Sequence, residues 1–131
     1  MGGDPMRDYL PKSYSLPKAV YYQALYAVRD YDRLRAEYDN ILHASAAPPD
    51  GLPHGSGSGQ PVADKAIRLN AISTKLMAIE RALNGIPPEY RRGVLDNVRY
   101  QSPYPYVACY RTWSTYRRRF LFGVAKNLRL L

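Results

Sequence analysis

Side chains suited to binding a polyanion gather near the C-terminal end of the chain. From Arg99 to residue 131 the sequence holds no aspartate or glutamate. On a helical wheel of about 100° per residue, one side of the segment that follows Thr112 is basic, and Arg111 lies at its entrance. The candidate contact residues are Arg111, Thr115, Arg118, Arg119 and Lys126. Lysine and arginine on such a face neutralise phosphates, and an arginine near the helix start can bind a guanine edge through two hydrogen bonds.

The opposite side of the same segment is apolar and includes Trp113, Phe120 and Val124. We expect Trp113 to be a buried anchor that holds this helix against the one before it. Phe122 differs, because the wheel places it on the basic, outward side. The alternative to nucleic-acid contact is a solvated cationic face at a chain end. The run of arginines at 117–119 and the absence of acids favour nucleic-acid contact.

The distribution of charge along the chain agrees with this interpretation. The 131 residues carry a formal net charge of +8, and residues 1–60 contribute six basic and seven acidic side chains to it. Residues 61–131 contribute thirteen basic and four acidic side chains. The positive charge therefore belongs to the second half of the chain. Such a segment favours DNA, RNA or an anionic surface as a partner, and composition alone does not choose among them.

Catalytic and metal-binding chemistry has little support in the sequence. His43 and His54 have no cysteine or carboxylate at metal-ligand spacing, so we expect no metal site and no cofactor. Cys109 is the only cysteine and has no identifiable base, so we expect a buried structural thiol. The acids after residue 61 are scattered over different predicted helices and form no acid/base pair. We therefore expect a binding protein and not an enzyme.

Tyrosine is unusually frequent, with thirteen in the chain. Tyr100, Tyr104, Tyr106 and Tyr110 are interleaved with the arginines at 99 and 111, a pattern that can stack nucleic-acid bases. Tyrosine also serves as a half-buried wall in small helical domains. We expect packing to be the role of most of the tyrosines.

Two long helices must position this end of the chain. Apolar or aromatic residues recur in alternating steps of four and three over residues 20–41 and again over residues 62–83. This spacing predicts two helices with coiled-coil-like seams. Residues 43–61 lose the periodicity and are rich in proline, glycine and serine, which predicts a flexible loop. The helices should fold back as a long antiparallel hairpin, either as a two-helix arm or as half of the bundle of a homodimer.

The C-terminal unit follows the hairpin. The prolines and glutamate at 87–89 suit the first turn of a third helix, which continues to Tyr100. Prolines at 103 and 105 end it, and a last helix begins near Thr112, which can serve as its N-cap. No segment alternates with a period of two, so the expected fold class is all-α. The expected units are a disordered or tag-like N-terminus at 1–16, the hairpin at 17–85 and a small basic unit similar to a helix-turn-helix at 86–131.

Four stretches of this C-terminal unit carry a family resemblance. They are Ile86-Pro87-Pro88-Glu89-Tyr90-Arg91-Arg92, Tyr106-Val107-Ala108, the segment 112–120 and the segment 124–128. Together they resemble the phage late-operon transcriptional activators of the RinA/ArpU type, which are similar in turn to the promoter-reading C-terminal domain of sigma factors. With the preceding helix, the similarity covers residues 62–131. The turn before Thr112 is shorter than in the family pattern, so we expect Arg119 to contact phosphate, while Arg118 contacts either phosphate or a base.

The resemblance implies a phage-derived regulator of late genes that binds double-stranded DNA in the cytoplasm of a bacterial host. The alternative is a phage accessory protein that binds RNA polymerase, a packaging component or a CRISPR nuclease that it inhibits. Phe122 and the surplus tyrosines motivate this alternative, because aromatic residues and arginine are enriched at interface anchors. No apolar run approaches the roughly 20 residues of a membrane span, and a single cysteine suits a reducing cytoplasm.

Overall fold

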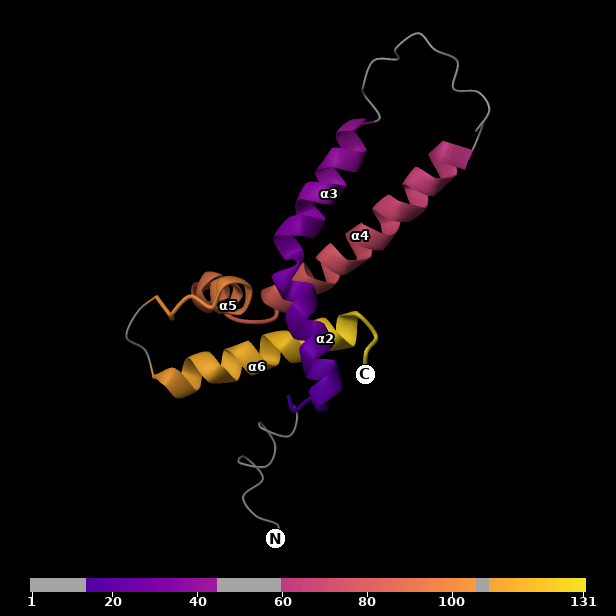
Figure 1. Ribbon diagram of the computed structural model, residues 1–131. Coiled ribbons are helices and arrows are strands. Elements are labelled where there is room, and N and C mark those ends of the chain that lie inside the picture. The colour runs from indigo at the N-terminus through magenta and orange to yellow at the C-terminus, as the bar shows by residue number, and fades with distance from the viewer. Residues whose placement is uncertain (1–13, 45–59, 106–108) are drawn as a thin grey trace.

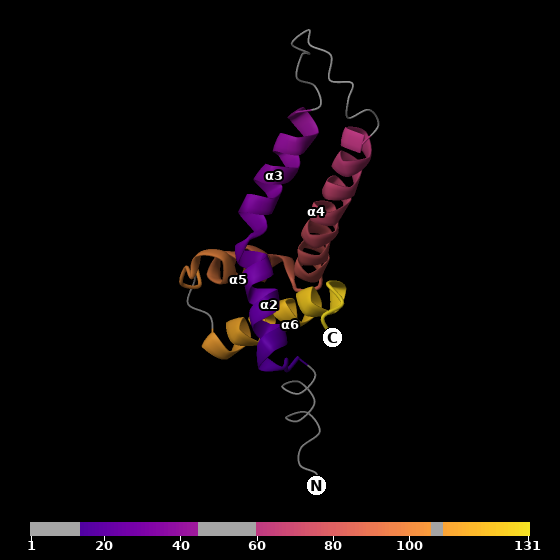
Figure 2. The ribbon, with the colours of Figure 1, turned by 45° about the vertical axis from the view of Figure 1, so that its right-hand side comes forward.

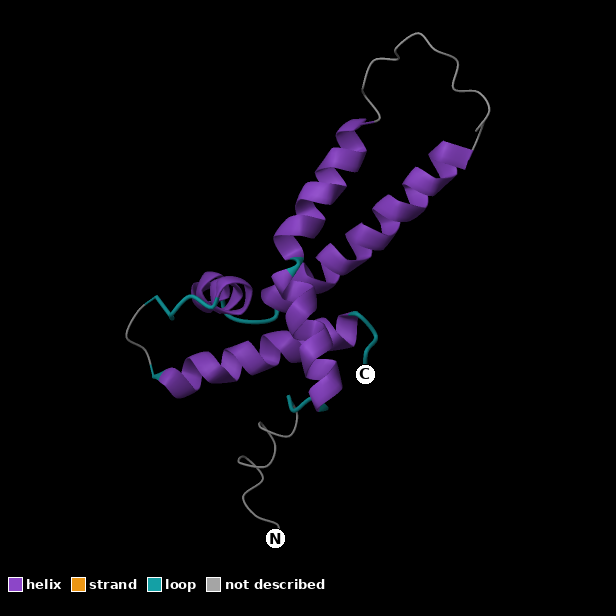
Figure 3. Ribbon diagram, viewed as in Figure 1, coloured by secondary structure: helices purple, strands orange, loops and turns teal. Residues whose placement is uncertain are grey.

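The computed structural model describes residues 14–44, 60–105 and 109–131, and every regular element within these ranges is a helix (Figures 1 and 3). The described helices are α2 (Lys18–Arg29), α3 (Tyr31–Ala44), α4 (Gln60–Asn84), α5 (Pro88–Tyr100) and α6 (Tyr110–Asn127). The all-α prediction is therefore confirmed for the described part of the chain. The predicted N-terminal tail up to residue 13, most of the predicted loop and the short piece 106–108 lie outside the described residues.

The N-terminal helix differs from the prediction of one continuous helix over residues 20–41. α2 ends at Arg29 and α3 begins at Tyr31, and Asp30 lies between them with φ −89° and ψ 1°. α2 crosses α6 and contacts α5, whereas α3 leans away along α4 (Figures 1 and 2). One straight helix cannot follow both directions, so the chain bends. The Asp30 carboxylate accepts two hydrogen bonds of 2.6 Å from the Arg33 side chain at this bend.

An arm is formed by α3 and by the first part of α4, residues 60–76, which lie side by side and run in opposite directions (Figures 1 and 2). Its buried side chains are Leu34, Ile72 and Leu76, with Tyr31, Tyr38 and Ile41 packed against them. All six belong to the predicted seams of the two helices. The arm therefore has a small core with three buried side chains among the described residues.

A head is formed by α2, the remainder of α4, α5 and α6. Its fully buried side chains include Val28, Ile79, Ile86, Val94, Phe120 and Leu121. α6 lies in the middle of this core, because it packs against α4, α2 and α5. None of the described helices is long and apolar enough to cross a lipid bilayer.

Trp113 fixes α6 against α5, and its exposed fraction is only 1%. The prediction of a buried anchor is therefore confirmed. The indole stacks on Tyr104 with ring centroids 4.7 Å apart and meets the Tyr90 ring edge-on at 4.8 Å. The backbone of α5 approaches so closely at Gly93 that a Cβ atom there would lie 2.6 Å from the indole. Position 93 has no room for a side chain, so glycine permits this contact between the two helices.

Candidate nucleic-acid interface

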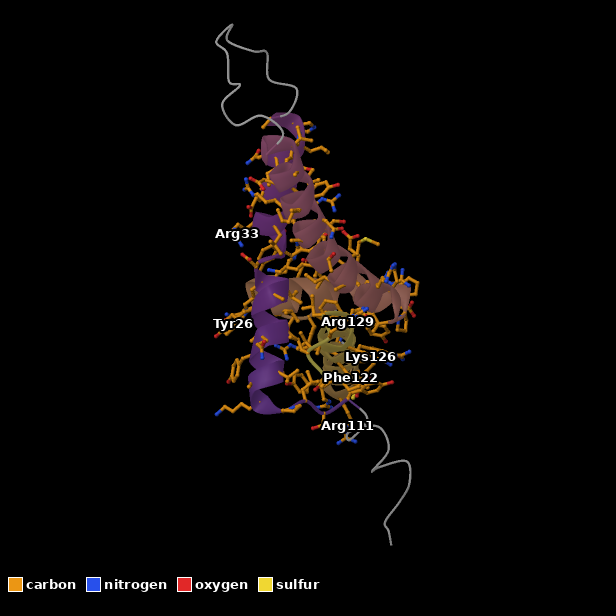
Figure 4. The ribbon with its side chains drawn as sticks, turned by 90° about the vertical axis from the view of Figure 1, so that its right-hand side faces the viewer. Tyr26, Arg33, Arg111, Phe122, Lys126 and Arg129 are labelled. Carbon is orange, nitrogen blue, oxygen red and sulfur yellow. The ribbon has the colours of Figure 1, made fainter. Side chains whose placement is uncertain are left out.

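The five predicted contact residues, Arg111, Thr115, Arg118, Arg119 and Lys126, share the outward side of α6 and are called the basic face below. Arg111, Arg118, Arg119 and Lys126 are exposed, and Thr115 is half-buried. The apolar side of α6 faces the core of the head, so the basic face is turned to solvent. In Figure 4, which looks nearly along α6, the labelled Arg111, Phe122 and Lys126 lie one above another on this side of the helix. At 1.5 Å per residue the basic face is about 22 Å long.

The cations of the basic face keep their charge available. Among the described residues, none of the four forms an ion pair with a carboxylate. Arginines elsewhere behave differently, since Arg35 pairs with Glu80 at 3.1 Å and Arg99 pairs with both Asp32 and Asp96 at 2.7 Å. An anionic ligand that approaches α6 therefore meets cations that no described acid has neutralised.

Arg117 lies beside Arg118 and Arg119 in sequence but points into the head. Its Nε donates to Asn97 Oδ1 at 2.9 Å, and its Nη1 donates to the Tyr21 hydroxyl at 3.1 Å. Asn97 in turn donates from Nδ2 to the Ser102 carbonyl at 2.8 Å. Arg117 therefore ties α6 to α5 and α2. The three consecutive arginines divide into one that holds the fold and two that face solvent.

Tyr14, which the sequence pattern did not single out, lies against the basic face. Its ring meets Phe122 edge-on with centroids 5.6 Å apart, so Phe122 is half-buried on the outward side. Tyr14 also lines two hollows, one of about 410 Å³ shared with Arg111 and Arg119 and one of about 500 Å³ shared with Arg118. The sequence pattern did not predict a role for Tyr14, because this residue belongs to a segment with no helical periodicity.

The cationic surface extends beyond the predicted residues. Arg129 and Arg81 line a hollow of about 280 Å³ beside the end of α6. Arg129 adopts φ 61°, and the N–H of Leu130 donates to the Ala125 carbonyl at 2.9 Å, as in a Schellman motif. The wheel of α6 cannot reveal these arginines, because Arg129 follows the helix and Arg81 belongs to α4.

The start of α6 departs from two expectations. The helix begins at Tyr110, and its N-cap residue is Cys109, not Thr112. Cys109 is exposed, so the prediction of a buried thiol is wrong. As the residue that precedes the first turn, it lies beside the backbone N–H groups of that turn and outside the core. Hydrogen bonding from the backbone of Arg111 and Thr112 lowers the pKa of the Cys109 thiol.

The tyrosines also divide between packing and exposure. Tyr104 packs on the indole of Trp113 as described, whereas Tyr100 and Tyr110 are exposed, and Tyr106 lies outside the described residues. The Tyr100 hydroxyl donates to the Asp32 carboxylate. Two further tyrosines of α2 are exposed, and the sequence pattern did not point to them.

Within the ranges that the structure describes, no group of three or more histidine, cysteine, aspartate or glutamate side chains is placed to hold a metal ion. Comparison of the chain with protein-family models, curated proteins and solved structures found no match. A functional proposal therefore depends on the chemistry of the surfaces described above.

Proposed function

We propose that the protein binds double-stranded DNA through the basic face of α6. The observation that carries the proposal is the row of four cations with no carboxylate partner among the described residues, on a helix that the core of the head holds in place. A duplex carries one negative charge for about every 1.7 Å of its axis. A face about 22 Å long can therefore contact several phosphates at once.

The contacts follow from the position of each side chain. Arg119 and Lys126 neutralise phosphates, and Arg118 contacts either a phosphate or the edge of a base in the groove. Thr115, whose hydroxyl donates to the Arg111 carbonyl at 2.8 Å, can turn to donate to a phosphate. With four cations engaged, the logarithm of affinity should fall with the logarithm of salt concentration with a slope of about −3.6.

In this proposal DNA binding serves the regulation of transcription, as in the phage late-gene activators that residues 62–131 resemble. α5 and α6 take the place of the helix-turn-helix unit, and the arm offers a surface on which a second copy can pair. A dimer presents two basic faces to one duplex, which raises the effective affinity without any new type of contact.

A protein partner is the second candidate function. The aromatic pair of Tyr14 and Phe122 lies among the arginines of the basic face, and tyrosine, phenylalanine and arginine are enriched at protein interfaces. The partners expected for this alternative are RNA polymerase, a packaging component or a CRISPR nuclease.

Fluorescence anisotropy with a short labelled duplex over a series of salt concentrations tests the proposal. The variant Arg118→Ala with Arg119→Ala removes two cations from the basic face. The matched control is Arg33→Ala with Arg35→Ala, which removes two cations that pair with Asp30, Glu37 and Glu80. Both double variants have the same net charge, so a difference between them reports position and not total charge.

We expect the α6 variant to lower the salt slope by about one unit for Arg119, and by about one more where Arg118 also contacts a phosphate. Loss of the Arg119 contact should weaken binding to every duplex sequence. The α3 variant should keep the slope of the unmodified protein. Equal losses in the two variants would show that binding follows net charge alone. An unchanged affinity in the α6 variant would make the protein partner the better candidate.

A further inference from the structure

α2 carries a second distinctive surface on its outward side. Lys18, Tyr22, Tyr26 and Arg29 follow one another in steps of four, four and three residues, so they share one face of the helix, which we call the tyrosine face. The exposed fractions of Tyr22 and Tyr26 are 42% and 57%. Their rings are nearly parallel, with centroids 6.1 Å apart and planes inclined by 21°. The Arg29 guanidinium carbon lies 5.7 Å from the centroid of the Tyr26 ring.

The core does not require these two rings. α2 buries Ala24, Leu25 and Val28 against the head, and the tyrosine face is turned the other way. In Figure 4, Tyr26 and Arg33 lie on the side of the molecule opposite Lys126 and Phe122. Exposed apolar side chains that gather in one patch, as these two rings do, mark interaction sites.

We propose that the tyrosine face binds single-stranded nucleic acid by stacking bases on Tyr22 and Tyr26. Residues four apart on one face of a helix are separated by about 6 Å along its axis. The two ring centroids are separated by 6.1 Å. Bases of a single strand that are not stacked on one another have free faces that can stack on aromatic side chains. Each of the two rings can therefore take one such base. Stacking of this kind tolerates any base, because every base has a flat face.

Charge complementarity favours a nucleic-acid strand over a protein as the occupant. Residues 14–29 contain no acid, and Lys18 and Arg29 stand at the two ends of the tyrosine face. The distance between their positions along the helix is about 16 Å, which a strand of a few nucleotides can span. The adjacent acid, Asp30, is bound by Arg33 at 2.6 Å. Cations at both ends of an aromatic row match a strand whose phosphates flank its bases.

This inference goes beyond duplex binding by the basic face and uses other residues. The probe is a fluorescent oligonucleotide of about 15 thymidines, a length within the range of known single-strand sites. A uridine oligonucleotide of equal length shows whether the protein prefers single-stranded DNA or RNA. The test variant is Tyr22→Ala with Tyr26→Ala, and its conservative partner is Tyr22→Phe with Tyr26→Phe. Arg118→Ala with Arg119→Ala serves as the control on the other surface. Circular dichroism checks that the exposed substitutions leave the helices intact.

We expect the alanine variant to bind the oligonucleotide at least tenfold more weakly, since loss of stacking costs a factor of about 5 to 150 for each base. The phenylalanine variant should bind it within about threefold of the unmodified protein. The α6 variant loses two cations and should weaken oligonucleotide binding less than the alanine variant does. Ultraviolet cross-linking followed by tryptic digestion should place the label on residues 19–29, the peptide between Lys18 and Arg29.

Three results would overturn the inference. The first is the absence of oligonucleotide binding at low salt. The second is a loss of oligonucleotide binding in the α6 variant that the alanine variant does not share, which would place the strand on the basic face. The third is self-association or binding of a purified protein such as RNA polymerase that depends on Tyr22 and Tyr26 while the oligonucleotide does not bind. Duplex binding is measured separately, so failure here leaves the proposal for α6 untouched.

Discussion

The arm and the basic face of the head use their charged residues in opposite ways. In the arm, Arg33, Arg35 and Arg68 each pair with a carboxylate. Arg35 of α3 pairs with Glu80 of α4, and Arg68 of α4 pairs with Glu37 of α3. The buried side chains of the arm are three in number. In the head the core is several helices thick, and the cations of the basic face pair with no described acid.

The difference indicates which part of the molecule depends on its charges for structure. A thin core leaves the arm helices to be aligned partly by ion pairs, whereas the head is held by buried apolar area and does not need the charges on the surface of α6. Cations that the fold does not need are free to contact a ligand. We therefore expect substitutions in the core of the head to affect stability, and substitutions on its surface to affect binding.

The largest effect should come from Trp113→Ala, which removes the anchor between α5 and α6. Loss of a buried indole should lower the free energy of unfolding by about 3–5 kcal/mol, measured by urea denaturation followed by circular dichroism. Ile67→Ala is the matched control in the arm, because Ile67 is 67% exposed and surface changes usually stay within about 0.5 kcal/mol. In the unmodified protein, tryptophan emission should be blue-shifted and unaffected by DNA. A red-shifted emission that DNA quenches would contradict the buried position.

An intermediate effect is expected from neighbouring arginines that point in opposite directions. Arg117→Met keeps the apolar stem but removes the hydrogen bonds to Asn97 and Tyr21, so it should destabilise the fold by about 1–3 kcal/mol. DNA affinity of the folded protein should change by less than about twofold. Arg119→Ala should do the reverse, with stability nearly constant and the salt slope lower by about one unit. If both substitutions act alike on stability and on binding, the division between structural and ligand-binding arginines fails.

The sequence predicts the helices and the inward side of α6 because both depend on local periodicity. The seams of the arm, the buried Trp113 and the outward position of Arg118 and Arg119 all follow from spacing along one helix. These features need no knowledge of the neighbouring elements.

The features that the sequence does not predict depend on contacts between distant segments. The bend at Asp30 arises because α2 packs against α5 and α6 in the head, whereas α3 packs against α4 in the arm. The inward direction of Arg117 requires Asn97 and Tyr21, and the cover over Phe122 comes from Tyr14, which is remote in sequence. Cys109 is exposed because α6 begins earlier than the N-cap pattern predicts, and helix boundaries are the least predictable feature of a sequence.

The smallest effect should come from the ion pair between Arg35 of α3 and Glu80 of α4, which lies where the arm meets the head and tests whether charges help to align the arm helices. Their atoms Nη1 and Oε2 lie 3.1 Å apart, and the two side chains are 56% and 43% exposed. Glu80 Oε2 also accepts a hydrogen bond of 2.8 Å from the Tyr31 hydroxyl, so removal of Arg35 leaves the carboxylate with one partner. A double-mutant cycle with Arg35→Ala and Glu80→Ala should give a coupling energy of about 0.2–1 kcal/mol, because solvent and salt screen an exposed pair. The coupling should shrink as salt is raised. A coupling above about 2 kcal/mol that salt leaves unchanged would show that this pair contributes as much as a buried contact, and the contrast between a charge-aligned arm and a core-held head would then have to be abandoned.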